Sequence, residues 1–216
     1  MHRLFVTWLA RLLLCLATSS PAWSQGNPTL AAHLRIVRIE SDTTVHADLT
    51  TRTRTVIERE ALTDQGLPAV GKFAQFYSKT LQSLEIDEAY TLKADGRRIP
   101  VGADGLQRQA GVVAPGVGQS WTDGEVLQLT FPDVQRGDRT VLTYTLRGLA
   151  TSLPGWVAGQ DYLVPFVGID RFRWTLRAAR SVDLQVAAPG LRLSPMATDS
   201  DWATWTIEGS SIPHDF

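Results

Sequence analysis

Residues 84–97 read LEIDEAYTLKADGR, and residues 131–138 read FPDVQRGD. In the first stretch apolar and polar residues alternate, which is typical of a β-strand with one buried face. The side chains expected on the buried face are Leu84, Ile86, Tyr90 and Leu92, and those expected on the other face are Glu85, Asp87, Thr91 and Lys93. Asp95 and Gly96 follow, and this pair favours the positive φ angles of a tight turn. The stretch therefore predicts a β-hairpin.

The same alternation recurs along most of the chain. Strands are expected at residues 34–39, 45–57, 81–93, 99–101, 126–131, 140–146, 171–177, 182–186 and 203–207. Because no long segment with helical periodicity separates them, antiparallel sheets packed face to face explain the pattern better than a parallel sheet. The sequence predicts an all-β fold, a large antiparallel β-sandwich with at most one or two short helices.

Two segments break this pattern. Residues 69–80 carry apolar side chains at three- and four-residue steps, so a short helix is expected there as a crossover. Residues 102–124 contain six glycines and little alternation, which predicts a long loop of the kind that often carries function. The alternative for this loop is a short strand at residues 109–114 between two tight turns.

The first 24 residues have the three parts of a signal peptide. Arg3 precedes an apolar run, and Ala22 and Ser24 are the small residues of a signal-peptidase site, so cleavage is expected between Ser24 and Gln25. The apolar run is too short for a membrane anchor, which needs about 20 residues. The protein is therefore expected to be exported, periplasmic or secreted, with no membrane span after cleavage.

Cleavage also changes the composition of the chain. It removes Cys15, the only cysteine, so the mature chain is expected to have no disulfide, catalytic cysteine or cysteine zinc site. Because residues 1–24 contain two arginines and no acidic residue, the formal net charge falls from −1 to −3. A negative mature chain argues against nucleic acid and anionic lipid as partners.

The sequence predicts neither a cofactor nor a metal site, and it names no catalytic residue. His33, His46 and His214 are widely separated and lack zinc-ligand spacing, and His46 is expected to be a solvated residue of a strand. Ser120 lacks the glycine pattern of a nucleophilic serine. Carboxylates are numerous, and the sequence leaves open whether two of them meet in a hydrolase site.

Two tryptophans lie in turn-like sequence. Trp121 follows Ser120 in a glycine-rich segment, and Trp156 follows Gly155. Aromatic rings at exposed turns can stack on sugars or hold peptides, whereas most tryptophans pack in a core. Trp121 and Trp156 are therefore the candidate ligand-binding residues.

The hairpin sequence of residues 89–101 and the segment 129–138 resemble an uncharacterised bacterial domain that precedes transglutaminase-like domains in exported proteins. The resemblance covers roughly residues 33–210. It implies a large antiparallel β-sandwich, with any catalysis supplied by a cysteine, a histidine and an aspartate of the following domain. The present sequence ends at Phe216 without such a domain, so those catalytic residues have no counterparts in it.

Together these observations predict a signal peptide at residues 1–24, a linker at 25–32, a β-sandwich at 33–210 and a linker-like tail at 211–216. The favoured interpretation is a non-catalytic, exported accessory or interaction module, with a transglutaminase-like or other exported protein as its partner. One alternative is a glycan- or peptide-binding module that uses the exposed turn tryptophans. A second alternative is a hydrolase with a dispersed carboxylate site.

Overall fold

The computed structural model describes residues 32–110, 123–151, 155–159, 163 and 167–213. The elements in chain order are β1 (Leu34–Val45), β2 (Thr51–Ala61), the 3₁₀-helix η2 (Asp64–Gly66), α2 (Leu67–Val70), β3 (Lys72–Ser78), β4 (Gln82–Leu92), β5 (Arg98–Pro100), the 3₁₀-helix η3 (Ala103–Gly105), β6 (Leu106–Ala110), β7 (Gly124–Thr130), β8 (Arg139–Gly148), β9 (Ile169–Ala179), β10 (Arg192–Leu193), β11 (Ala197–Thr198) and β12 (Trp202–Ile212). The all-β prediction is confirmed, and no helix in these residues is long and apolar enough to cross a membrane.

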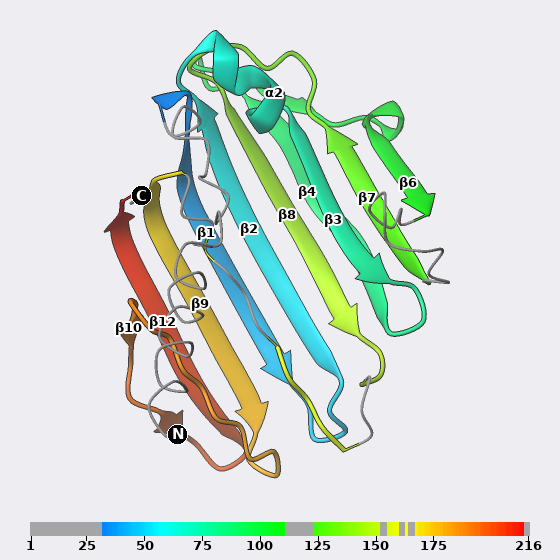
Figure 1. Ribbon diagram of the computed structural model, residues 1–216, viewed down its shortest axis with the longest axis vertical. Coiled ribbons are helices and arrows are strands. Elements are labelled where there is room, and N and C mark those ends of the chain that lie inside the picture. The colour runs from blue at the N-terminus through cyan, green and yellow to red at the C-terminus, as the bar shows by residue number, and fades with distance from the viewer. Residues whose placement is uncertain (1–31, 111–122, 152–154, 160–162, 164–166, 214–216) are drawn as a thin grey trace, which may run out of the picture.

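Nine strands form one large sheet in the order β10, β12, β9, β1, β2, β8, β4 and β5, with β11 paired to β12 (Figure 1). Its neighbouring strands are antiparallel, except that β1 and β9 run parallel. A parallel pair needs a long crossover connection. β9 follows β8 in the sequence but pairs with β1, on the side of β1 away from β2.

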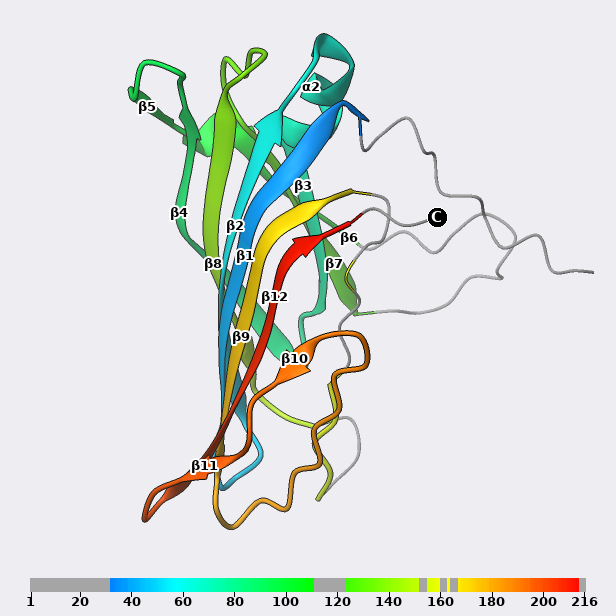
Figure 2. The ribbon, with the colours of Figure 1, turned by 90° about the vertical axis from the view of Figure 1, so that its left-hand side faces the viewer.

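β3, β7 and β6 form a second, three-stranded antiparallel sheet that covers part of one face of the large sheet (Figure 2). The leucines of β7 lie between the sheets: Leu127 packs with Leu84 of β4, and Leu129 packs with Leu142 of β8. Both β7 leucines are at most 1% exposed. Full burial of one such side chain stabilises the fold by about 2 kcal/mol, so this contact holds the two sheets together.

Irregular segments cover the other half of this face. Val157, Val182 and Val186 pack on a buried cluster of β1, β9 and β12 that includes Trp205. The predicted strand at residues 182–186 is therefore wrong, although its apolar side chains are partly buried as the alternation suggested. The segment has a buried side but pairs with no strand in the described residues, and strand structure requires that pairing.

The opposite face of the large sheet is covered by none of the described elements (Figure 2). We call it the open face. Its outward side chains include Arg38, Glu40, Glu58, Arg139 and Arg173. Polar residues are expected on a sheet face that water reaches.

A β-bulge in β4 reverses the predicted alternation. The register with β8 shifts between Ile86 and Glu88. Ile86 faces the second sheet, but beyond the bulge Ala89 takes that face, and Tyr90 turns to the open face beneath the guanidinium of Arg98. An extra residue in one strand moves all later side chains to the other face. The predicted common face of Leu84, Ile86, Tyr90 and Leu92 is therefore wrong.

The helix predicted at residues 69–80 is also wrong beyond its first two residues, because α2 ends at Val70 and β3 follows. Phe73 and Tyr77 are four residues apart, a spacing that fits one face of a helix and equally one face of a strand. Gly71 closes the helix, and its amide donates to the carbonyl of Leu67 at 2.8 Å. Pairing of all of β3 with β7 then decides for the strand.

The strand predicted at residues 45–57 contains the last residue of β1, a tight turn at residues 46–50 and the first part of β2. Leu49 has a positive φ of 67°, and its amide donates to the carbonyl of His46 at 2.9 Å. Oδ1 of Asp48 accepts hydrogen bonds from the amide and the hydroxyl of Thr50. His46 is therefore a turn residue, and its predicted place within a strand is wrong.

The predicted loop at residues 102–124 is partly regular. It contains η3 and strand β6, which occupies residues 106–110 and so begins three residues before the alternative strand at 109–114. Residues 111–122 lie outside the described residues. At the other end of the chain, β12 extends to Ile212, two residues into the predicted tail.

Candidate functional site

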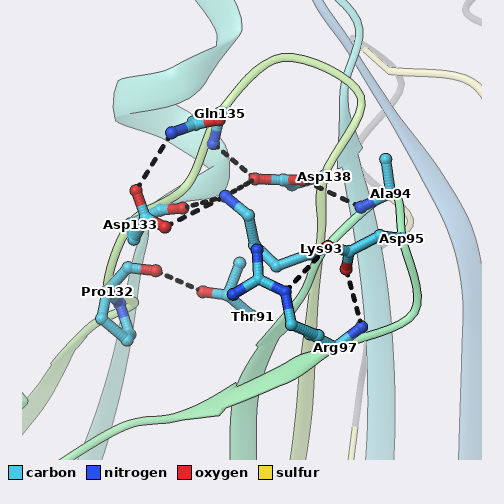
Figure 3. Close-up of polar contacts among 9 residues, drawn as sticks. All are labelled: Thr91, Lys93, Ala94, Asp95, Arg97, Pro132, Asp133, Gln135 and Asp138. Atoms are coloured by element: carbon cyan, nitrogen blue, oxygen red, sulfur yellow. Dashed lines mark hydrogen bonds and ion pairs between the residues drawn. The ribbon is translucent and has the colours of Figure 1, made fainter.

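The two turn motifs of the sequence meet at one end of the large sheet, as the close-up in Figure 3 shows. The turn between β4 and β5 contains Gly96, with a φ of 88°, and the turn between β7 and β8 contains Gly137, with a φ of 83°. Glycine adopts such angles without the steric cost of a Cβ atom. Both glycines therefore serve the turn geometry, and the turns are then joined by side chains.

Lys93 joins the two turns (Figure 3). Its Nζ lies 2.6 Å from Oδ2 of Asp138, 2.8 Å from the carbonyl oxygen of Asp133 and 3.2 Å from Oδ2 of Asp133. An ammonium group has three protons, so these three acceptors can use all of its donors. The side chains of Lys93 and Asp138 are 8% and 4% exposed, so this ion pair is buried.

Asp138 is satisfied in the same way. Oδ1 accepts the amide of Ala94 at 3.2 Å, and Oδ2 accepts the amide of Gln135 at 2.8 Å. The backbone of the turn binds β2, because the amide of Ala61 donates to the carbonyl of Asp138 and the amide of Gly137 donates to the carbonyl of Ala61. The carboxylate of Asp138 thus fixes its own turn and the β4–β5 turn, and the backbone of residues 137 and 138 holds the end of β2.

The chemistry of Lys93 favours a structural role. Its hydrogen bond to Asp138 raises the pKa of the ammonium above 10.5, burial opposes this, and the hydrogen bond to Asp133 adds to the rise. A lysine nucleophile needs a lowered pKa. Lys93 therefore stays protonated at neutral pH, and the cluster of Lys93, Asp133 and Asp138 holds the fold together.

A second polar cluster, which the sequence did not reveal, joins the two sheets. Arg108 of β6 donates to the hydroxyl of Tyr77 and, at 3.0 Å, to the carbonyl of Leu84 in β4, and the hydroxyl of Tyr77 donates to Glu125. Burial, then the hydrogen bond to Glu125, raises the pKa of Tyr77, and that same hydrogen bond is the main cause of the lowered pKa of Glu125. Tyr77 therefore keeps its proton and joins Arg108 to Glu125 within the second sheet, while the bond from Arg108 to Leu84 links the two sheets.

A hollow of about 580 Å³ lies beside the end of β12. Both of its lining carboxylates pair with lining arginines: Glu40 lies 2.9 Å from Arg171, and Glu208 lies 3.7 Å from Arg173. Catalytic carboxylates of a glycosidase face each other across the substrate, whereas these two each face an arginine. The hollow thus does not favour the hydrolase interpretation.

The open face carries a continuous chain of ion pairs. Glu58 contacts Arg139 at 3.0 Å and Arg38 at 2.9 Å, Arg38 also contacts Glu40 at 3.1 Å, and Glu40 contacts Arg171 at 2.9 Å. The chain of contacts runs across β8, β2, β1 and β9. Glu58, with a side chain that is 10% exposed, is the most buried member of this network. Surface ion pairs stabilise a fold by only about 0–1 kcal/mol each, but a network fixes where the charges lie.

Of the two predicted ligand-binding residues, Trp121 and Trp156, the structure describes only Trp156. Trp121 lies outside the described residues. Trp156 is 73% exposed, while its neighbour Val157 packs on the core, so the ring stands in solvent on an anchored segment. Exposure agrees with the expected contact role, and ligand binding stays a prediction.

Two of the three histidines considered in the sequence analysis, His33 and His46, lie within the described residues and have separate neighbours. Nδ1 of His33 lies 2.7 Å from the hydroxyl of Thr63, the ring of His46 packs against Trp202, and His214 lies outside the described residues. Within the part of the chain that the structure describes, no group of three or more histidine, cysteine, aspartate or glutamate residues is placed to hold a metal ion.

The fold and these clusters define the class of protein: it is an all-β domain of two sheets. The two turn motifs that distinguish its sequence stabilise this fold. A family profile for a domain of unknown function, DUF3857, matches residues 47–215. The chain therefore belongs to the DUF3857 family. Comparison with curated proteins gave no match.

Two solved structures that match this chain belong to longer proteins. A "putative protease" from Parabacteroides distasonis matches with a TM-score of 0.75 and 14% sequence identity over 86% of this chain and 37% of that one. An M1 zinc metallopeptidase from Deinococcus radiodurans matches with a TM-score of 0.43 and 13% identity over 82% of this chain and 39% of that one. The chain thus spans less than half of each protein, and the first likeness establishes the fold alone.

Proposed function

We propose that this chain is a non-catalytic interaction module of an exported protein, and that its partner is a catalytic domain of the transglutaminase-like or peptidase-like kind. The observation that carries the proposal is the open face of the large sheet, which none of the described elements covers. A surface of this width with fixed charges suits specific docking, because charges held in place select a complementary partner.

Two further observations support the proposal. The motifs that distinguish the sequence are used within the domain, since Lys93 and Asp138 have all of their polar groups bound. The fold also forms only 37% of the protein from Parabacteroides distasonis, so it occurs there beside other parts of a longer chain. A domain of this kind contributes binding and leaves chemistry to its neighbour.

Reversal of one open-face charge tests the proposal. Arg173→Glu, at a side chain that is 58% exposed, is expected to weaken binding to a purified exported transglutaminase-like domain from the same genome by at least tenfold in titration calorimetry. Lys72→Glu makes the same change of charge at an exposed residue of β3 in the second sheet and is expected to leave the Kd within twofold. Equal losses in both variants, or no binding by the unaltered protein, would refute docking on the open face.

A second candidate function rests on Trp156. Its 73% exposure beside an anchored residue fits a stacking platform for a saccharide ring. If the chain binds a glycan, Trp156→Ala is expected to weaken that binding at least tenfold, while Phe76→Ala, at a ring that is 57% exposed, leaves it unchanged. A glycan array on which the unaltered protein retains no saccharide would end this candidate.

A further inference from the structure

One row across the open face consists of arginines without ion-pair partners. The strand register places Arg147 of β8 opposite Arg52 of β2, Arg52 opposite Thr44 of β1, and Thr44 opposite Arg177 of β9. All three arginines are exposed. We call these residues the arginine row.

The other arginines of the open face contrast with this row. Those that form ion pairs are Arg35, Arg38, Arg54, Arg98, Arg139, Arg171 and Arg173. Within the described residues, Arg52 and Arg147 form no ion pair, whereas Arg177 stacks on Trp202 at 4.9 Å and interacts electrostatically with Asp199. Arg192, opposite Glu208 on the edge strand β10, also forms no ion pair in the described residues, so the distinctive feature of the row is that Arg52 and Arg147 lie unpaired on neighbouring strands.

Acidic residues do lie near the row, but they do not neutralise it. Asp42 and Glu85 occupy the next row along the strands, and Asp199 lies on the turn that leads into β12. None of the three forms an ion pair with the arginine row in the described part of the chain. Arg52 and Arg147 therefore present positive charge to solvent without an acidic partner, whereas Asp199 balances part of the charge of Arg177.

This arrangement costs stability. Like charges directly opposite one another on neighbouring strands are destabilising, and Arg52 and Arg147 are such a pair. The rest of the face shows that this sheet readily places an acid beside an arginine. A counter-charge from outside the chain would relieve the cost.

We propose that the arginine row binds an acidic segment of the partner protein. Neighbouring strands lie about 4.8 Å apart, so Arg147 and Arg177, three strands apart, span about 14 Å, the length of four or five extended residues. A guanidinium group can donate two hydrogen bonds to a carboxylate, and on this face Nε and Nη2 of Arg35 already donate to one oxygen of Glu60. This inference rests on the proposed function and specifies the partner's chemistry.

Binding of fluorescein-labelled hexaglutamate to the mature protein tests the row. The double variant Arg52→Gln/Arg147→Gln is expected to weaken binding at least tenfold in fluorescence anisotropy at low salt. The control Arg97→Gln/Arg98→Gln removes the same charge from exposed arginines that have acidic partners, and it is expected to stay within twofold. Equal weakening in both doubles, or no binding by the unaltered protein, would overturn the proposal.

Two further readouts distinguish recognition of an acidic segment from a role of the row in folding or in membrane binding. The melting temperature of Arg52→Gln/Arg147→Gln is expected to rise by about 1–3 °C, because a like-charge pair is removed, and a fall would show that the arginines stabilise the fold instead. If phosphatidylglycerol vesicles bind through the same residues and hexaglutamate does not, the ligand of the row is a membrane surface and the proposed acidic segment is refuted. If the protein binds hexaglutamate but binds no catalytic domain, the arginine row is a site for acidic segments and the proposed function is refuted.

Discussion

Replacement of Lys93 by methionine is expected to lower the melting temperature by about 10 °C. The change leaves the Asp138 carboxylate, at 4% exposure, without its cation, and it also frees the carbonyl of Asp133. Breaking one partner of a buried ion pair is costly because the other charge remains away from water. Thermal unfolding followed by circular dichroism measures the effect.

Controls distinguish the buried pair from a general loss of charge. Asp133→Asn, at a carboxylate that is 54% exposed, is expected to change the melting temperature by no more than about 2 °C. The double variant Lys93→Met/Asp138→Asn is expected to be less destabilised than the sum of the single changes, since it strands no full charge. Additive single effects would contradict the pairing.

The pH dependence gives an independent check. Because the pKa of Lys93 is raised in the folded protein, its contribution is complete below the unfolded value of 10.5 and is lost as the pH rises through the folded value. The gap in melting temperature between the unaltered protein and Lys93→Met should therefore be constant from pH 6 to about pH 9 and narrow above 10.5. A gap that narrows below pH 8 would contradict the assignment.

Local turn chemistry made part of the fold predictable. Asp95-Gly96 and the glycine at position 137 both mark turns with positive φ, as residue preferences indicate. Most predicted strands exist because alternation reports one buried face. The split at residues 46–50 was missed because no glycine or proline marks it, and Leu49 adopts its positive φ without a sequence signal.

Non-local pairing made the rest unpredictable. The bulge after Ile86 is defined only by the register with β8, some 60 residues away in sequence, and nothing within β4 announces it. The parallel pairing of β1 with β9 likewise joins segments more than 130 residues apart. Local periodicity gives the buried face of a strand but not its neighbour.

The same limit applies to the candidate sites. The segments that contain Lys93 and Asp138 were singled out from the sequence, but the bond between these two residues, 45 positions apart, was not. The arginine row is visible only when the register aligns Arg52, Arg147 and Arg177. Trp156 was found because exposure of a residue beside a turn glycine is a local property.

Arg59→Met is expected to destabilise the protein by about 3 kcal/mol, a fall in melting temperature of about 6–12 °C. Arg59 donates to the carbonyls of Ala69, Val70 and Lys72 at 2.9–3.0 Å, and its guanidinium lies 6.0 Å from the ring centroid of Phe131. These carbonyls belong to the end of α2 and the start of β3, where the helix leaves acceptors unpaired. Methionine fills the space but donates nothing.

Burial lowers the pKa of Arg59 to about 10, so the side chain remains charged at neutral pH even though its acceptors are carbonyls. Arg59→Lys is expected to fall between the unaltered protein and Arg59→Met, because an ammonium on a shorter reach serves fewer of the three carbonyls. Arg98→Met, at a side chain that is 63% exposed, should shift the melting temperature by less than about 2 °C.

Hydrogen exchange locates the effect within the fold. The amide of Gly71 donates to the carbonyl of Leu67, and the amide of Phe131 donates to the carbonyl of Gly71, so both report on the junction of α2 and β3. In Arg59→Met these two amides should exchange at least tenfold faster. The exchange rate of amides in the centre of β9 should change only as much as the loss of global stability requires. Uniform acceleration of exchange across the large sheet would show that Arg59 supports the whole domain. No acceleration at Gly71 would contradict the role of Arg59 in fixing the direction in which β3 leaves α2.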